Sequence, residues 1–293
     1  MGFEGFRLAQ LEVGEVSLRV CHGGCGPPLV LLHGYPQTHM MWGQVATELA
    51  EDFTVVVPDL RGYGDSSKPA AVPDHESYSK RVMAGDVIGL MDHFGFDSFD
   101  VAGHDRGGRV AYRLALDHPQ VVRRLSVLDI IPTGEVWGRA DQRFALGYWH
   151  WPLLAQPYPI PETLIAPDPE WFFFDAQFGG VIRSFQPEAV ADYVRCARDG
   201  SVIHAICEDY RAGATYDRLL DEQDRAAGWK ITCPTQVLWG AKGALAAWYD
   251  PLDIWRNWAY DVTGQALDSG HFLAEEKPYE TLSALHRFHT DHR

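Results

Sequence analysis

The stretch that decides the fold is GHDRGGR at residues 103–109, which directly follows the apolar run FDVA at residues 99–102. The residues after it have helical character, so the stretch predicts a strand-to-helix turn with Asp105 at its tip. Glycines two residues before and two residues after Asp105 allow a sharp turn and close packing of the strand against the helix. Such a turn presents its central side chain as a nucleophile. The alternative is an ordinary surface aspartate in a glycine-rich turn, and the partners described below disfavour it.

An aspartate nucleophile determines the class of reaction. A serine that displaced a leaving group from a saturated carbon would leave an ether, which water in the site could not cleave. An aspartate leaves an ester, and a water molecule activated by a base can hydrolyse an ester. Asp105 therefore predicts displacement at an sp³ carbon, with either a halide leaving or an epoxide opening, and it excludes ordinary serine-esterase chemistry.

Length and composition exclude several other classes. A chain of 293 residues can bury one large core with a subdomain inserted into it. Lys and Arg total 25 and Asp and Glu total 40, and the resulting charge of −15 disfavours nucleic acid as a partner. The N-terminus lacks the features of a signal peptide, and no apolar run approaches the ~18 residues of a membrane span. Five cysteines without C-x-x-C spacing indicate neither a disulfide framework nor a zinc site. We expect a cytoplasmic protein with no membrane partner, no metal and no cofactor.

Strands and helices alternate over two parts of the chain. Short apolar runs at 28–32, 53–57, 99–102 and 125–130 are typical of strands buried on both faces of a sheet. Helical stretches lie between them, and this alternation predicts an α/β fold with a mostly parallel, doubly wound sheet.

The alternation stops after Ile131. Residues 137–178 contain eleven Trp, Tyr or Phe residues and six prolines, and helical stretches follow before strands return at residue 234. We therefore predict a core domain formed by residues 1–131 and 226–293, with a helical cap domain at 132–225 inserted between two of its strands.

A base and an acid follow the nucleophile in the chain. His271 comes after the last predicted strand, where a histidine is expected in the order nucleophile, acid, histidine. The acid often follows the strand that ends here in Trp239-Gly240, but no carboxylate stands there. By elimination the acid is Asp129, at the end of the strand 125–128, although a strand-end cap is the alternative interpretation of that residue.

Backbone and guanidinium groups complete the predicted site. The backbone N–H groups of Tyr35 and Arg106 are candidates to stabilise negative charge on the Asp105 carbonyl. Arg106 and Arg109 lie three residues apart on the helix that begins at the nucleophile, so they share a face. Two guanidinium groups beside a helix N-terminus can hold a carboxylate. The substrate is therefore predicted to be a small anion, even though the whole protein is acidic.

The chain resembles the fluoroacetate dehalogenases, a branch of the α/β-hydrolase fold, over nearly its whole length. The motifs that carry the resemblance are HGYP (33–36), GHDRGGR (103–109), Asp129, His150-Trp151, EDYR (208–211) and Gly270-His271. The resemblance implies an Asp105 nucleophile, a His271 base and an Asp129 partner, with the substrate carboxylate clamped by Arg106 and Arg109. It also implies that His150, Trp151 and Tyr210 bind the departing halide. Related enzymes are commonly homodimers, so a homodimer is expected here as well.

Two alternatives remain at this stage. An epoxide hydrolase shares the Asp, His and Asp residues, but it normally carries two cap tyrosines and has no use for the arginine pair. A receptor that binds small molecules on a hydrolase scaffold would not need an intact nucleophile, base and acid. A pocket narrowed by Trp151 and Tyr210 predicts short acids as substrates, and residues 241–248 match no motif of the family.

Overall fold

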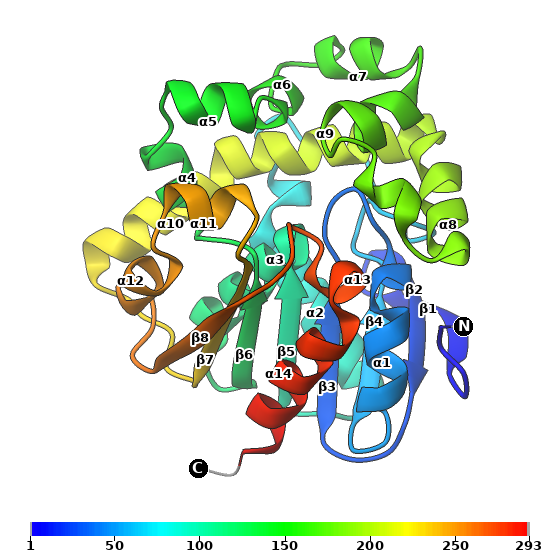
Figure 1. Cartoon of the computed structure of the whole chain (residues 1–293), viewed down its shortest axis with the longest axis vertical. Coiled ribbons are helices and arrows are strands. Elements are labelled where there is room, and N and C mark those ends of the chain that lie inside the picture. The colour runs from blue at the N-terminus through cyan, green and yellow to red at the C-terminus, as the bar shows by residue number, and fades with distance from the viewer. Residues whose placement is uncertain (1, 292–293) are drawn as a thin grey trace.

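The computed structural model describes residues 2–291, which form one sheet in the order β1-β2-β4-β3-β5-β6-β7-β8 (Figure 1). The strands are β1 (Arg7–Val13), β2 (Val16–Gly23), β3 (Pro28–Leu32), β4 (Thr54–Pro58), β5 (Phe99–His104), β6 (Val122–Leu128), β7 (Thr235–Gly240) and β8 (Val262–Leu267). β2 runs antiparallel to β1 and β4, and the other neighbouring pairs are parallel. The predicted α/β class with a mostly parallel sheet is confirmed.

Helices cover both faces of this sheet. The α-helices are α1 (Gly43–Leu49), α2 (Lys80–His93), α3 (Asp105–Asp117), α4 (Thr133–Gly138), α5 (Gln142–Gly147), α6 (His150–Leu154), α7 (Ile160–Ile165), α8 (Pro187–Ala197), α9 (Gly200–Ala214), α10 (Tyr216–Ala227), α11 (Ala244–Trp248), α12 (Pro251–Arg256), α13 (Leu273–Glu276) and α14 (Pro278–Thr290). Helix α1 packs against α14 in front of the sheet in Figure 1, and α2 packs against α3 behind it. No helix within residues 2–291 is both long enough and apolar enough to span a membrane.

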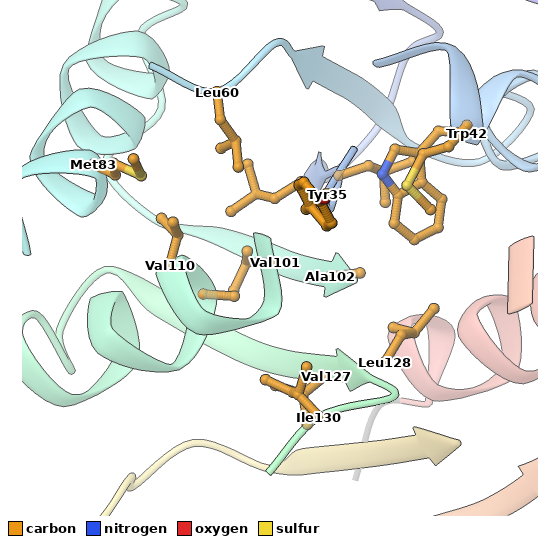
Figure 2. Close-up of a cluster of buried hydrophobic side chains, with 14 of the residues drawn as sticks. Tyr35, Trp42, Leu60, Met83, Val101, Ala102, Val110, Val127, Leu128 and Ile130 are labelled. Atoms are coloured by element: carbon orange, nitrogen blue, oxygen red, sulfur yellow. The ribbon is translucent and has the colours of Figure 1, made fainter. Parts of the chain in front are cut away.

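The core lies between the sheet and these two helical layers. Every residue of β3 and β5 is buried, as expected for parallel strands covered on both faces. Figure 2 shows Val101 of β5 beside Val110 of α3, with Met83 of α2 on the same side and Trp42 on the opposite side. The apolar runs of the sequence are thus the strands at the centre of the molecule.

The path of the chain creates a crevice at the carboxyl ends of β3 and β5. From β3 the chain moves to β4 on one side, and it later returns to β5 on the other side. In doubly wound sheets, ligands bind where the strand order reverses in this way. The residues that follow these two strands are Gly34-Tyr35 and Asp105, so the fold brings both predicted motifs to one crevice.

Helices α4 to α10 lie between β6 and β7 in the chain, and in Figure 1 most of them lie above the carboxyl ends of the strands. The 3-10 turns at His39–Trp42 and Glu76–Tyr78 lie outside this inserted segment. A π-helical turn (Trp171–Ala176) and a 3-10 turn (Val181–Ser184) lie within it, between α7 and α8. Helix α10 continues to Ala227, so the predicted boundary at residue 225 falls within its last turn.

Candidate active site

The turn between β5 and α3 holds Asp105 in a conformation that few residues adopt. Asp105 has a φ of 44°, in the left-handed region that usually favours glycine. A Cβ on Gly103 would lie 2.4 Å from the Gly107 carbonyl oxygen, and a Cβ on Gly34 would lie 2.6 Å from the Asp105 Cβ. The flanking glycines are therefore required by close packing, and the strained residue is the predicted nucleophile.

The Asp105 carboxylate is held by one of the two predicted backbone donors. The Tyr35 backbone N–H donates to Asp105 Oδ2 over 3.0 Å. Burial alone would raise the pKa of Asp105, but the charges of His271, Arg109 and Arg106 outweigh burial and lower this pKa. The carboxyl is therefore ionised at neutral pH, as a nucleophile must be. The role of the Arg106 backbone N–H as a second donor stays a prediction.

His271 and Asp129 meet although 142 positions separate them in the chain. The Nδ1–H of His271 donates to Asp129 Oδ2 over 2.6 Å, and Asp129 Oδ1 accepts the Gly240 N–H over 2.9 Å. Burial lowers the pKa of His271, but the hydrogen bond and charge of Asp129, together with Asp105, raise it above 6.5 overall. Asp129 thus orients His271 in place of the acid that the sequence lacks after Gly240.

His104 contacts the base, His271, and this contact was not predicted from the sequence. Its Nε2–H donates to the backbone carbonyl of His271 over 2.8 Å, and the two rings lie 4.6 Å apart. Burial, followed by the charge of His271, lowers the pKa of His104 to about 3, so this ring is neutral. The only sequence signal for this role is the place of His104 immediately before the nucleophile.

A cavity of about 240 Å³ joins these groups. Its lining includes Asp105, Arg109, Asp129 and His271 from the sheet side, and His150, Trp151 and Tyr210 from helices α6 and α9. Seven of the eight residues whose side chains were predicted to form the site therefore line one cavity, and Arg106 is the exception.

Arg109 reaches the cavity from the second turn of α3. Its Nη1 donates to the Ile131 carbonyl and to Thr133 Oγ1, each over 3.1 Å. Its Cζ lies 4.6 Å from the ring centroid of Trp151, so a cation–π contact adds to these hydrogen bonds. Arg109 is thus a buried, oriented cation next to the nucleophile.

Arg106 is fully buried behind the cavity. Its Nε and Nη2 donate to the Asp209 carboxylate over 2.9 and 2.6 Å, and its Cζ lies 4.2 Å from the ring centroid of Tyr210. Among the described residues, Nη1 has no hydrogen-bond partner. The prediction of a freely available Arg106 clamp is therefore not met, because two of the three guanidinium nitrogens bind Asp209 and only Nη1 has no partner among the described residues.

Asp209 gathers a buried network that the sequence did not reveal. It accepts hydrogen bonds from Arg106, from Lys80 and, over 2.6 Å, from the Tyr63 hydroxyl. Burial would raise the pKa of Asp209, but Arg106 and Lys80 outweigh burial and lower this pKa well below its usual range. These contacts connect α9 to α2 and α3, the two helices that pack against each other on one face of the sheet.

We expect the Asp209→Asn substitution to lower the free energy of unfolding by about 3–5 kcal/mol, because it leaves the buried Arg106 without its counter-charge and Lys80 with only Asp217, 3.7 Å away. Urea denaturation would measure this loss. The matched control is Asp65→Asn, which removes an exposed ion pair with Arg195 and should cost at most ~1 kcal/mol. Equal stability of the two variants would show that the network does not hold α9 in place.

The three predicted halide ligands form one aromatic cluster, in which His150 and Tyr210 contact Tyr35 and Trp151 contacts Tyr210 with 5.8 Å between centroids. Tyr35 stacks on His150 with 6.0 Å between centroids, and its ring edge meets Tyr210 at 5.3 Å. Chiefly through burial, the pKa of His150 is lowered to about 3, so its neutral ring has one N–H to donate. The Trp151 indole N–H and the Tyr210 hydroxyl donate to no described residue, which leaves both donors available in the cavity.

Several lining residues were missed because no motif marks them. Gln177 Oε1 accepts the Tyr35 hydroxyl over 2.6 Å, and Phe178 stacks on His271 with 6.1 Å between centroids. Both follow the π-helical turn, in the aromatic-rich part of the sequence. Tyr148, directly after α5, also lines the cavity.

A second group of Ser, His and Asp side chains lies elsewhere and is structural. His289 Nε2 is hydrogen-bonded to Ser126 Oγ over 3.0 Å, and its Nδ1 is hydrogen-bonded to Asp100 Oδ2 over 2.9 Å. All three side chains are buried, and none lines the cavity. This group fastens α14 to β5 and β6.

Comparison with known proteins places the chain in a family. The family model for the α/β hydrolase fold matches residues 27–154. A fluoroacetate dehalogenase from Burkholderia sp is 44% identical over 294 residues, which cover 99% of this chain and 96% of that protein. The chain belongs to the α/β-hydrolase family. The resemblance to the fluoroacetate dehalogenases that its motifs predicted is confirmed by this relative.

Two further relatives extend the comparison of this α/β hydrolase. The crystal structure of a putative α/β hydrolase from Nostoc sp PCC 7120 has 51% sequence identity and a TM-score of 0.95, and covers 98% of this chain and 99% of its own. A soluble epoxide hydrolase from Corynebacterium sp. (strain C12) is 34% identical over 302 residues, which cover 95% of this chain and 96% of that protein. The protein is a hydrolase of this fold, and its relatives include enzymes named for both reactions that an aspartate nucleophile favours.

Proposed function

We propose that this hydrolase is a haloacetate dehalogenase that converts fluoroacetate, and other 2-haloacids, to the 2-hydroxy acid and a halide ion. The observation that carries the proposal is the buried Arg109 guanidinium in the same cavity as Asp105 and three aromatic donors. A cation beside the nucleophile fits an acid substrate, and the donors fit a small anionic leaving group.

In the first step, Asp105 attacks the carbon that bears the halogen. A carbon–oxygen bond forms as the carbon–fluorine bond breaks, and fluoride leaves with the electron pair. Arg109, which lines the cavity, holds the carboxylate of the substrate, and the buried Arg106 adds its positive charge beside the site. His150, Trp151 and Tyr210 donate hydrogen bonds to fluoride. A hydrogen bond to a charged group contributes about 1–3 kcal/mol, so three of them lower the barrier by several kcal/mol.

In the second step, His271 takes a proton from water, and the resulting hydroxide attacks the carbonyl carbon of the Asp105 ester. The Tyr35 N–H stabilises the oxyanion that develops on Oδ2, and Asp129 stabilises the imidazolium ion. The intermediate collapses, the ester carbon–oxygen bond breaks, and the leaving alkoxide oxygen takes the proton from His271 to become the hydroxyl of glycolate. The Asp105 carboxyl then releases its proton to solvent, which restores both residues.

Epoxide hydrolysis is the second candidate, because Tyr148 and Tyr210 both line the cavity and could protonate an epoxide oxygen. Turnover of fluoroacetate and chloroacetate, followed by halide release, tests the proposal against turnover of styrene oxide, followed by diol formation. We expect halide release and at least a hundredfold lower kcat/KM for the epoxide. Diol formation without halide release from either acid would contradict the proposal.

The rate of ester hydrolysis should fall as the pH drops. His271 must be neutral to accept a proton, and its raised pKa places the half-maximal rate above pH 6.5. In Asp129→Asn this midpoint should move to lower pH, because the main stabiliser of the imidazolium ion is gone. Single-turnover hydrolysis measured from about pH 5 to pH 9 would show it. An acid limb with the same midpoint in both proteins would rule out His271 as the base held by Asp129.

Replacing Tyr210 with Phe should discriminate among leaving groups. Fluoride is small and strongly hydrated, so its departure depends more on hydrogen-bond donors than the departure of bromide does. We expect Tyr210→Phe to lower kcat for fluoroacetate by roughly 10- to 100-fold and to lower kcat for bromoacetate less. Tyr260→Phe, at an exposed tyrosine, is the matched control. Equal losses for the two acids would argue against Tyr210 as a halide ligand.

A further inference from the structure

Two consecutive glutamates, Glu275 and Glu276, end the short helix α13, which follows the loop that carries His271 (Figure 1). No role was predicted for either residue from the sequence. Neither glutamate is among the described residues that line the catalytic cavity. Any part that they take in the reaction must therefore be exerted through other residues.

The Glu276 carboxylate holds the backbone on both sides of His271. Its Oε2 accepts the Gly270 N–H over 2.7 Å, and its Oε1 accepts the Phe272 N–H over 3.0 Å. Neither N–H donates to a described backbone carbonyl, and Phe272 is buried, so the loss of the carboxylate would leave these donors unpaired. One side chain therefore fixes both residues that flank the base.

Other contacts complete the hold on His271. Its backbone carbonyl accepts the His104 Nε2–H over 2.8 Å, and its Nδ1–H donates to Asp129 over 2.6 Å. Asp129 thus orients the ring, whereas His104 and Glu276 fix the peptide groups from which the ring extends. The Asp129 contact can keep its geometry only while these peptide groups stay in place.

Glu275 anchors α13 to two other parts of the site. Its Oε1 accepts the Tyr193 hydroxyl of α8 over 3.0 Å, and its Oε2 accepts a hydrogen bond from the Gln37 side-chain amide. Gln37 lies two residues after Tyr35, in the turn that follows β3. Helix α13 is thus fastened both to the turn that carries the oxyanion donor and to α8, which gives Glu276 a fixed position.

We propose that Glu276 is a positioning residue for the base: by holding the peptide groups on both sides of His271, it fixes the imidazole where it takes a proton from water. This inference rests on the proposed function, because it assigns Glu276 to the second chemical step. The first step needs no base, and the hydrogen bonds of Glu276 in the described part of the chain involve neither Asp105 nor Arg109. Glu276 therefore acts on hydrolysis of the ester and not on its formation.

The Glu276→Gln variant separates these two steps. It keeps the size of the side chain but replaces one acceptor with an NH₂ group, which faces one of the two N–H groups. A displacement of about 1 Å can cost about 10²-fold in rate, so we expect the ester to be hydrolysed roughly 10- to 100-fold more slowly. Bromide release in the first turnover of bromoacetate should stay near the wild-type rate, and the esterified protein should accumulate.

Rapid quenching, with bromide and intact-protein mass measured on the same samples, follows both steps. Glu280→Gln makes the same change at an exposed position of α14 and should leave both rates unchanged. Ester hydrolysis at the wild-type rate in Glu276→Gln, or equal slowing of both steps, would overturn the inference alone. No bromide from the wild-type protein would overturn the proposed function itself.

The pH profile of ester hydrolysis is a second readout, which a general loss of packing would not shift. Burial lowers the pKa of His271, whereas the hydrogen bond and charge of Asp129 and the charges of Asp105 and Glu276 raise this pKa. The midpoint should therefore move to lower pH in Glu276→Gln and stay in place in Glu280→Gln. An unchanged midpoint in Glu276→Gln would overturn the inference. The titratable groups around the ring are Asp105, Asp129, Glu276, His104 and His150.

Hydrogen exchange in the wild-type protein tests the contact without any variant. The backbone N–H groups of Gly270 and Phe272 should exchange at least ~100-fold more slowly than in an unfolded chain, because both donate to Glu276. Exchange of both groups at the unfolded rate would overturn the inference, even if Glu276→Gln failed to fold.

Discussion

Asp105→Asn should lower halide release from every haloacid at least ~10⁴-fold, because an amide is a poor nucleophile and forms no ester. Asparagine has nearly the same shape as aspartate and tolerates the left-handed conformation that this position requires. The fold should therefore survive, and the loss should appear in kcat. Halide release by the purified variant, with circular dichroism to verify folding, measures the effect.

The matched control for this variant is Asp97→Asn, which makes the same chemical change at an exposed position after α2. It should retain the wild-type rate. Residual halide release by Asp105→Asn within tenfold of the wild-type rate would mean that water, or another group, attacks the substrate directly. The proposed covalent mechanism would then be wrong.

His271→Asn should separate the two chemical steps. Asp105 is still ionised in this variant, so the first step continues and each active site releases one halide ion. Without a base the ester persists, and steady-state turnover should fall by roughly 10²–10⁴-fold. We expect a burst of halide equal to the enzyme concentration, and an intact-protein mass that increases by one esterified glycolate.

The trapped ester also locates the nucleophile, because digestion of the protein should place the added mass on the peptide that contains Asp105. His286→Asn, at a half-buried histidine of α14 whose side chain is 42% exposed, is the control and should show no accumulation. A His271→Asn variant that turns over continuously at the wild-type rate would show that another group activates the water.

Much of this fold follows from local features of the sequence. β3 is apolar throughout, β5 is apolar apart from Asp100 and His104, and a sheet covered on both faces buries such strands completely. The placement of Asp129 follows from chain order and from the absence of an acid after Gly240. In the structure Asp129 Oδ2 lies 2.6 Å from His271 Nδ1, so the two residues predicted to pair are in contact.

Other parts of the site depend on how distant segments pack, and the sequence carries no local signal for them. Asp209 contacts Arg106 only because α9 lies over α3, across a separation of 103 residues. For this reason the sequence predicted two available guanidinium groups, whereas two of the three nitrogens of Arg106 are occupied. Leu245 and Val136 also line the cavity, and they were missed because apolar residues that line a cavity resemble those of the core.

A single turnover of fluoroacetate in ¹⁸O-labelled water, with enzyme in excess, tests the ester intermediate most directly. We expect the label to enter the Asp105 carboxylate and the glycolate to be unlabelled, because water attacks the carbonyl carbon of the ester. Label in the glycolate of the first turnover, with none in Asp105, would contradict the ester intermediate on which the proposed function depends.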